Sequence, residues 1–213
     1  MKTDELITVL STNVEPIDRR QLSREVVAAV ILGIVVAIGS ALALPGMRMD
    51  IGAPNALTYF CAKIIFATVI VIAGTAYLLR LARPGVVSPT RSVPLPWPPV
   101  AVAAIATVSL VSAPLWHWHN MAMGHGWLEC LVSIPIIAVV PFAAVVWAVR
   151  RMAPTDLART GALAGFVAGG ISAAGYALHC TDDSIPFIAL WYGGAIVMCT
   201  LAGALLGPRL LRW

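Results

Sequence analysis

Six long apolar runs dominate this chain, and they decide what it can fold into. A helix needs about 20 predominantly apolar residues to cross the hydrocarbon core of a bilayer. Runs of roughly that length occupy residues 25–44, 57–79, 98–115, 127–149, 157–177 and 187–206. Of the 213 residues, 60% are hydrophobic and 11% are charged, a balance that soluble domains do not show. The sequence therefore predicts an all-α polytopic membrane protein, a bundle of six transmembrane helices.

The first apolar run is predicted to be a retained span rather than a cleaved secretory signal. Residues 41–43 (ALA) have the small-x-small form that a signal peptidase favours. However, the run is longer than the roughly 7–15 apolar residues of a signal peptide, and a long polar segment precedes it. We therefore expect the chain to keep its amino terminus.

The lysines and arginines predict the orientation, because cytoplasmic loops of membrane proteins carry an excess of them. With the amino terminus in the cytoplasm, only Arg48 and Lys63 of the fourteen basic residues fall outside. Residues 1–24 then form a cytoplasmic segment, 25–206 the membrane domain and 207–213 a short cytoplasmic tail. The net charge of +4 is explained by this topology, without a nucleic-acid partner.

Two stretches predicted to lie on the outer side of the membrane, which in a bacterial chain would be the periplasm, hold all four histidines and two of the four cysteines. They are residues 116–130 (WHWHNMAMGHGWLEC) and 178–184 (LHCTDDS). Imidazole, thiolate and carboxylate groups together bind zinc, cadmium or copper. No spacing in either stretch is diagnostic of a metal site. The candidate ligands are His117, His119, His125, Glu129, Cys130, His179, Cys180, Asp182 and Asp183.

The two outer cysteines allow three interpretations. They could bind a soft or borderline divalent metal transiently, with help from the neighbouring side chains. They could form a disulfide, if the α-carbons of Cys130 and Cys180 come within about 7 Å. They could also be two unrelated buried thiols. None of the three requires a resident cofactor.

The polar amino-terminal segment contains one apolar stripe. Leu6, Ile7, Leu10 and Val14 recur at helical spacing, and Pro16 ends the pattern. Such a helix either lies on the membrane surface or docks its apolar face into the groove of a cytoplasmic partner. The residues alone leave both interpretations open.

The fifth apolar run has a ridge of small residues. Gly161, Gly165, Gly169 and Ala173 follow one another at four-residue spacing. Small residues at this spacing let the backbones of two membrane helices approach closely. The sequence predicts that this helix is the most tightly packed of the bundle.

Several stretches of the chain resemble the NrsF family of bacterial inner-membrane anti-sigma factors. They are residues 1–7 (MKTDELI), 129–131 (ECL), 134–135 (IP), 179–184 (HCTDDS) and 190–193 (LWYG). The stretch around the second cysteine is the most specific of them. Six predicted spans and a very similar length extend the resemblance over the whole chain.

The resemblance implies a regulator and not an enzyme. Such proteins hold an extracytoplasmic-function sigma factor at the membrane, and two cysteines facing the periplasm sense heavy-metal or oxidative stress. By position, the sensing residues would be Cys130 and Cys180. The sigma contact would fall on Leu6, Ile7 and Leu10.

Two other functional classes remain alternatives on the residues alone. A quinone-linked thiol oxidoreductase would share the periplasm-facing cysteines, but usually has a Cys-x-x-Cys pair, which this chain lacks. A metal transporter would place polar groups near the bilayer centre. The middles of these six runs offer only serines, threonines and Cys199.

Overall fold

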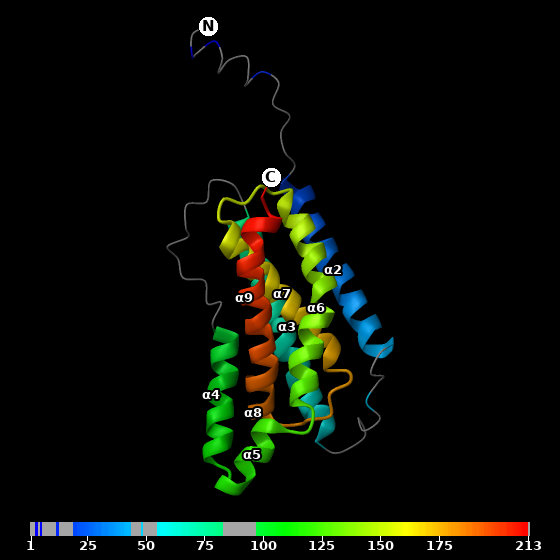
Figure 1. The fold of residues 1–213 in the computed structure, drawn as a ribbon, viewed down its shortest axis with the longest axis vertical. Coiled ribbons are helices and arrows are strands. Elements are labelled where there is room, and N and C mark those ends of the chain that lie inside the picture. The colour runs from blue at the N-terminus through cyan, green and yellow to red at the C-terminus, as the bar shows by residue number, and fades with distance from the viewer. Residues whose placement is uncertain are drawn as a thin grey trace.

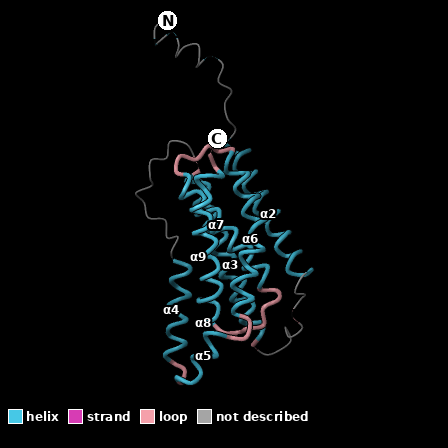
Figure 2. Tube along the Cα trace, in the orientation of Figure 1, coloured by secondary structure: helices cyan, strands magenta, loops and turns pink. Residues whose placement is uncertain are grey.

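The computed structural model describes residues 19–43, 48, 55–82 and 97–212, together with Thr3, Glu5 and Thr12. All regular structure in this part of the chain is helical, as predicted, and none of it is strand (Figure 2). The elements are α2 (Arg19–Ala43), α3 (Ala56–Leu81), α4 (Trp97–Val111), α5 (Leu115–Met123), α6 (Trp127–Arg150), α7 (Leu157–Tyr176), α8 (Ile185–Phe187), a π-helical turn (Ile188–Tyr192) and α9 (Gly193–Leu210).

Five helical stretches are long and apolar enough to cross a membrane. They are Arg20–Ala43, Ala56–Leu81, Leu115–Arg150, Leu157–Tyr176 and Ile185–Leu210. The remaining predicted span, 98–115, contains α4, whose 15 residues extend only about 22 Å at 1.5 Å per residue. This helix ends early because the chain turns at Ser112 and Ala113, just before Pro114, which disfavours helix in the residue that precedes it.

The long helices run alternately up and down, so their ends gather at two opposite ends of the bundle (Figure 1). One end, called here the arginine end, holds Arg20 at the start of α2 and Arg80, Arg150 and Arg209 in the last turns of α3, α6 and α9. At the other, called the cysteine end, α6 begins, α7 ends and α8 begins (Figure 1). These four arginines thus lie at one end of the bundle, in keeping with the predicted topology.

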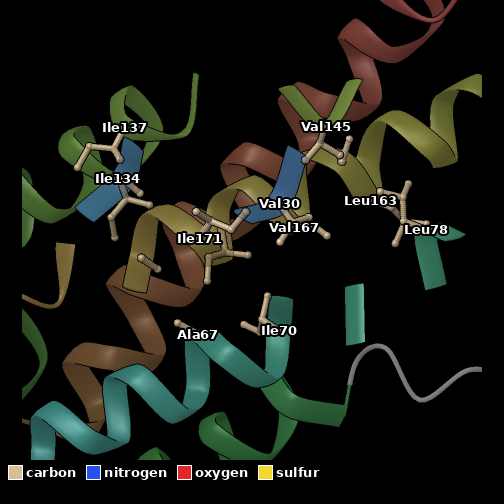
Figure 3. Close-up of a cluster of buried hydrophobic side chains, with 14 of the residues drawn as sticks. Val30, Ala67, Ile70, Leu78, Ile134, Ile137, Val145, Leu163, Val167 and Ile171 are labelled. Carbon is tan, nitrogen blue, oxygen red and sulfur yellow. The ribbon is translucent and has the colours of Figure 1, made fainter. Parts of the chain in front are cut away.

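Helix α7 is the centre of the bundle and contacts α2, α3, α6 and α9. Aliphatic side chains such as Val30, Ile70, Ile134 and Val167 form a continuous core between these helices (Figure 3). Burial of apolar surface of this kind and close packing hold the interior together.

The predicted close approach of α7 is confirmed at its contact with α9. A β-carbon on Gly161 would collide with the carbonyl oxygen of Gly203, and one on Gly165 with that of Cys199. A β-carbon on Gly203 would in turn collide with the carbonyl oxygen of Gly161. The two backbones are therefore in direct contact, which only glycine permits.

Two local elements differ from the sequence expectation. Residues 115–123, expected as part of an outer loop, form the nine-residue helix α5, whose first hydrogen bond runs from the His117 N–H to the Pro114 carbonyl (2.9 Å).

The last long helix contains a π-helical turn, Ile188–Tyr192, directly after α8. The fully buried Tyr192 and the Trp191 indole, which donates to the Ala122 carbonyl at 2.7 Å, both lie in that turn.

Candidate functional site

Cys130 and Cys180 come together at the cysteine end of the bundle. Cys130 lies in the first turn of α6, where its N–H donates to the Gly126 carbonyl (2.9 Å), and Cys180 follows α7 directly. Both side chains are buried in the same core, with 0% and 5% exposure, and both are free thiols. Both thiols therefore lie at the same end of the bundle, and no disulfide joins them.

Lys63 reaches from α3 to the Cys180 segment. Its ammonium nitrogen lies 3.0 Å from the carbonyl oxygen of Cys180, 3.6 Å from its sulfur and 3.1 Å from Oδ1 of Asp183. An ammonium group has three donors, so each of them has an acceptor here. The Lys63 side chain is completely buried, and a buried charge of this kind needs its partners.

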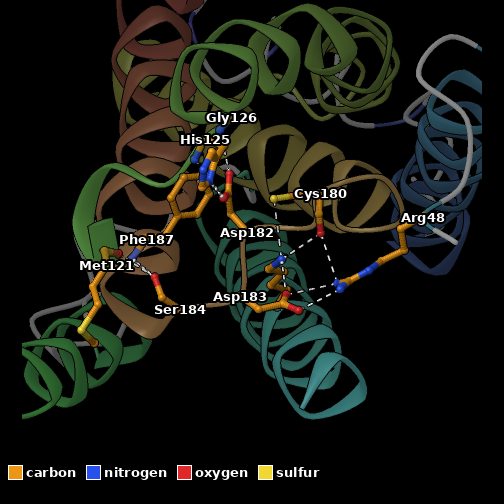
Figure 4. Close-up of polar contacts among 10 residues, drawn as sticks. Arg48, Met121, His125, Gly126, Cys180, Asp182, Asp183, Ser184 and Phe187 are labelled. Atoms are coloured by element: carbon orange, nitrogen blue, oxygen red, sulfur yellow. Dashed lines mark hydrogen bonds and ion pairs between the residues drawn. The ribbon is translucent and has the colours of Figure 1, made fainter. Parts of the chain in front are cut away.

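Arg48 holds the same segment from the connection between α2 and α3. Its guanidinium donates to the Cys180 carbonyl (3.2 Å) and to both carboxylate oxygens of Asp183 (3.2 and 2.8 Å), as Figure 4 shows. Its backbone N–H also donates to the Leu178 carbonyl (3.0 Å). Arg48, Lys63 and Asp183 are called the charged clamp below. Asp183, a predicted metal ligand, is thus the counter-ion of two buried cations.

The neighbouring carboxylate, Asp182, holds the turn between α5 and α6. Its two oxygens accept from the backbone N–H groups of His125 (2.9 Å) and Gly126 (2.8 Å). The Ser184 hydroxyl adds a second link, because it donates to the Met121 carbonyl at 2.6 Å (Figure 4). The two stretches singled out in the sequence are therefore tied to each other by hydrogen bonds.

A polar pocket of about 220 Å³ opens between these stretches. The predicted metal ligands found in its wall are His125, Glu129, His179, Cys180 and Asp182. Cys180, although buried, thus borders the pocket, whereas Cys130 is fully buried. No three His, Cys, Asp or Glu side chains of the described residues are arranged to hold a metal ion. The pocket therefore gathers potential ligands without preassembling a metal centre.

The other predicted ligands and cysteines lie elsewhere. His117 and His119 are exposed on α5. Cys61 is exposed near the start of α3, and Cys199 is buried in α9 against α7, as expected for a small apolar side chain. The predicted sigma contacts Leu6, Ile7 and Leu10 lie outside the described residues.

Comparison with known proteins identifies the family. Residues 10–213 match the model of the family described as NrsF, negative regulator of sigma F. The chain belongs to the NrsF family. Two relatives support this: the probable anti-sigma-F factor NrsF of Azospira oryzae, 32% identical over 213 residues, and the anti-sigma-F factor NrsF of Caulobacter vibrioides, 31% identical over 219 residues. Both comparisons cover the whole of both chains. No solved structure matches the chain.

Membership of the NrsF family confirms the resemblance found in the sequence. The family is described by a regulatory role, so the prediction of a regulator rather than an enzyme also holds.

Sequence reasoning missed the role of Arg48 and Lys63 in this NrsF-family chain. A signal was present, since these are the two basic residues that fall on the wrong side of the predicted topology. Charged residues in such positions are costly and pair with other groups. In the structure, the carboxylate that pairs with both of them is Asp183.

Proposed function

We propose that this chain sequesters an extracytoplasmic-function sigma factor at the bacterial inner membrane and releases it when Cys130 and Cys180 react with a heavy metal or an oxidant. The observation that carries the proposal is the position of these two free thiols, buried in the same core at one end of the bundle, in a chain related over its full length to two proteins named as anti-sigma-F factors. Binding of the metal is transient, and no resident cofactor is required.

The proposed topology has six spans, with α4 as the shortest. The arginine end faces the cytoplasm, in keeping with the preference of lysine and arginine for that side. The segment 1–24 and the tail 207–213 then lie in the cytoplasm, and the domain 25–206 lies in the membrane. The cysteine end faces the periplasm, where both metals and oxidants arrive from outside.

Reaction of the two thiols supplies the energy for a switch. Cys180 borders the polar pocket, so the first encounter with a metal ion or an oxidant is assigned to it. Oxidation would join the two sulfurs and pass two electrons and two protons to the oxidant, whereas a metal would replace the thiol protons. Moving a two-state equilibrium from 1:99 to 99:1 requires about 5.5 kcal/mol of preference for one state. A disulfide or a pair of thiolate–metal bonds can provide that preference.

Binding of the sigma factor is assigned to the amino-terminal segment. Leu6, Ile7 and Leu10 would form one apolar face of a short helix that docks into a groove of the sigma factor. This segment leads directly into α2, which begins at Arg19.

The first prediction concerns capture of the sigma factor. In a pull-down with the full chain, replacing Leu6, Ile7 and Leu10 together by serine is expected to lower capture at least about tenfold, which corresponds to about 1.4 kcal/mol. The physical reason is the loss of the apolar face that would be buried. A control variant with Thr3→Ala and Thr12→Ala, two exposed positions of the same segment, should capture as well as the unmodified chain. Undiminished capture by the serine variant would refute this binding mode.

The second prediction concerns sensing. Cys130→Ser and Cys180→Ser should each raise the dose of cadmium or peroxide that releases half of the sigma factor by about tenfold or more. Serine keeps the volume but removes the sulfur that reacts. Cys61→Ser and Cys199→Ser are matched controls and should leave the dose response unchanged. A normal response in both Cys130→Ser and Cys180→Ser would remove the sensing role.

A further inference from the structure

The charged clamp connects the Cys180 segment to α3 and to the connection between α2 and α3. Lys63 belongs to α3, and Arg48 lies between α2 and α3. Each of them contacts the Cys180 carbonyl and the Asp183 carboxylate, at distances from 2.8 to 3.2 Å. Lys63 alone also contacts the sulfur of Cys180.

Losing these contacts one at a time would carry a large free-energy penalty. The side chains of Arg48 and Lys63 have 0% exposure, whereas that of Asp183 has 19%. Removing one partner of a buried ion pair leaves a charge without compensation, which is strongly unfavourable. The clamp therefore stays together, so a displacement of Cys180 moves Arg48 and Lys63 with it.

The packing shows which neighbours each helix has. Helix α7, which leads into Cys180, is fixed to α9 by backbone contacts at Gly161 and Gly165. Helix α2 has a broad exposed face that includes Ile31, Leu32 and Val35, and its opposite side meets the backbone of α7 where the Ala37 carbonyl lies against Gly175. Rigid helices of this kind carry a displacement from one end to the other. Helix α2 has 25 residues and extends about 37 Å, from the cysteine end to the arginine end.

From this geometry we infer that the charged clamp is the coupling element of the protein: a change in bonding at Cys180 moves Lys63 and Arg48, and through them α3, α2 and the amino-terminal segment. Arg48, Lys63 and Asp183 are positioning residues in this scheme, and they do not bind the metal or the oxidant. The inference rests on the proposed function for its final step, the release of the sigma factor. Its first step, from Cys180 to α3, stands independently.

The experiment uses the chain's own exposed cysteine as a reporter. Cys61 lies two residues before Lys63 on α3 and is exposed, whereas Cys130 and Cys180 are buried. An environment-sensitive fluorophore is attached to Cys61 in the full-length Cys199→Ser protein, reconstituted in lipid nanodiscs with the bound sigma factor. Diamide or cadmium ions are then added. Reaction of Cys130 and Cys180 is followed by mass spectrometry, α3 by the emission of the fluorophore, and the sigma factor by its release.

The test variants are Lys63→Met and Arg48→Met, each of which leaves Asp183 paired with the other cation. In both, the emission change and the sigma release, compared at the same extent of thiol reaction, should each fall about tenfold, a common size for an allosteric coupling. Cys130 and Cys180 should react as in the parent protein in Arg48→Met, whereas Lys63→Met removes an ammonium group 3.6 Å from the Cys180 sulfur and should slow that reaction. Lys63→Arg should restore both signals in part. Arg151→Met, which breaks the exposed Glu25–Arg151 pair at the arginine end, is the control and should change neither.

Each outcome decides the inference. If Lys63→Met and Arg48→Met release the sigma factor at the parental dose, the clamp does not couple the sites. If the thiols themselves stop reacting in these variants, the clamp acts on cysteine reactivity and the coupling role is overturned. If the parent protein shows the emission change but keeps its sigma factor, coupling to α3 stands and the proposed function fails. Arg48→Met provides the measurement if Lys63→Met does not accumulate in the membrane.

Discussion

Asp183→Asn is expected to lower the free energy of unfolding by about 3–5 kcal/mol, the usual loss when one partner of a buried ion pair is removed. Asparagine keeps the shape of the side chain but removes the negative charge that faces Arg48 and Lys63, both fully buried at their side chains. Native proteins are stable by only about 5–15 kcal/mol, so this loss should be evident. Unfolding of the purified protein in mixed micelles measures it.

Two variants show whether the loss has this electrostatic origin. Glu25→Gln makes the same carboxylate-to-amide change in the Glu25–Arg151 pair, where the Arg151 side chain is 50% exposed. Such exposed pairs contribute only about 0–1 kcal/mol. Lys63→Met leaves the Arg48–Asp183 pair intact and should be clearly less damaging than Asp183→Asn. Equal losses in all three variants would contradict the assignment of Asp183 as the common counter-ion.

Gly165→Leu is expected to destabilise the membrane domain strongly. Even a β-carbon at this position would collide with the Cys199 carbonyl, so α7 and α9 must separate to admit a leucine side chain. Overpacking of a core costs about 1–3 kcal/mol when side chains can shift. Here the obstacle is backbone, and the loss should be at the top of that range or above it. Thermal unfolding in detergent, followed by circular dichroism, measures the effect.

Gly39→Leu is the matched control for this substitution. Gly39 lies in α2, and nothing is within 4 Å of a β-carbon placed on it. Replacing glycine in an exposed part of a helix does not lower stability, because glycine is itself a poor helix former. Gly39→Leu should therefore unfold at or above the temperature of the unmodified chain. If Gly165→Leu did so too, the close α7–α9 contact would be refuted.

Most of the fold could be predicted because a bilayer imposes simple requirements on a sequence. The apolar runs located α3, α6 and α7 to within two residues at each end, and the four-residue glycine spacing indicated the close contact of α7. Hydrophobicity alone did not show that α4 ends at Val111, since the run continues to Leu115. Nor did it show α5, whose helical residues include three polar ones.

The site could be predicted only in part, for a different reason. The sequence showed which side chains could bind a metal or react with an oxidant, and the family resemblance selected Cys130 and Cys180 from among them. It did not show how each carboxylate is used. Asp182 and Asp183 are adjacent, yet one binds backbone N–H groups and the other binds two cations. Such assignments depend on contacts between residues far apart in the sequence, 56 positions from Gly126 to Asp182 and 135 positions from Arg48 to Asp183.

The π-helical turn at Ile188–Tyr192 has a consequence for the whole of the last helix. An α-helix rotates by about 100° per residue, so a turn that holds one residue more shifts the phase of everything beyond it by about that angle. Tyr192 can thus point into the core beside the thiols while Gly203 and Gly207 still meet α7. A regular α-helix over the same residues could place either Tyr192 in the core or Gly203 and Gly207 against α7, but not both.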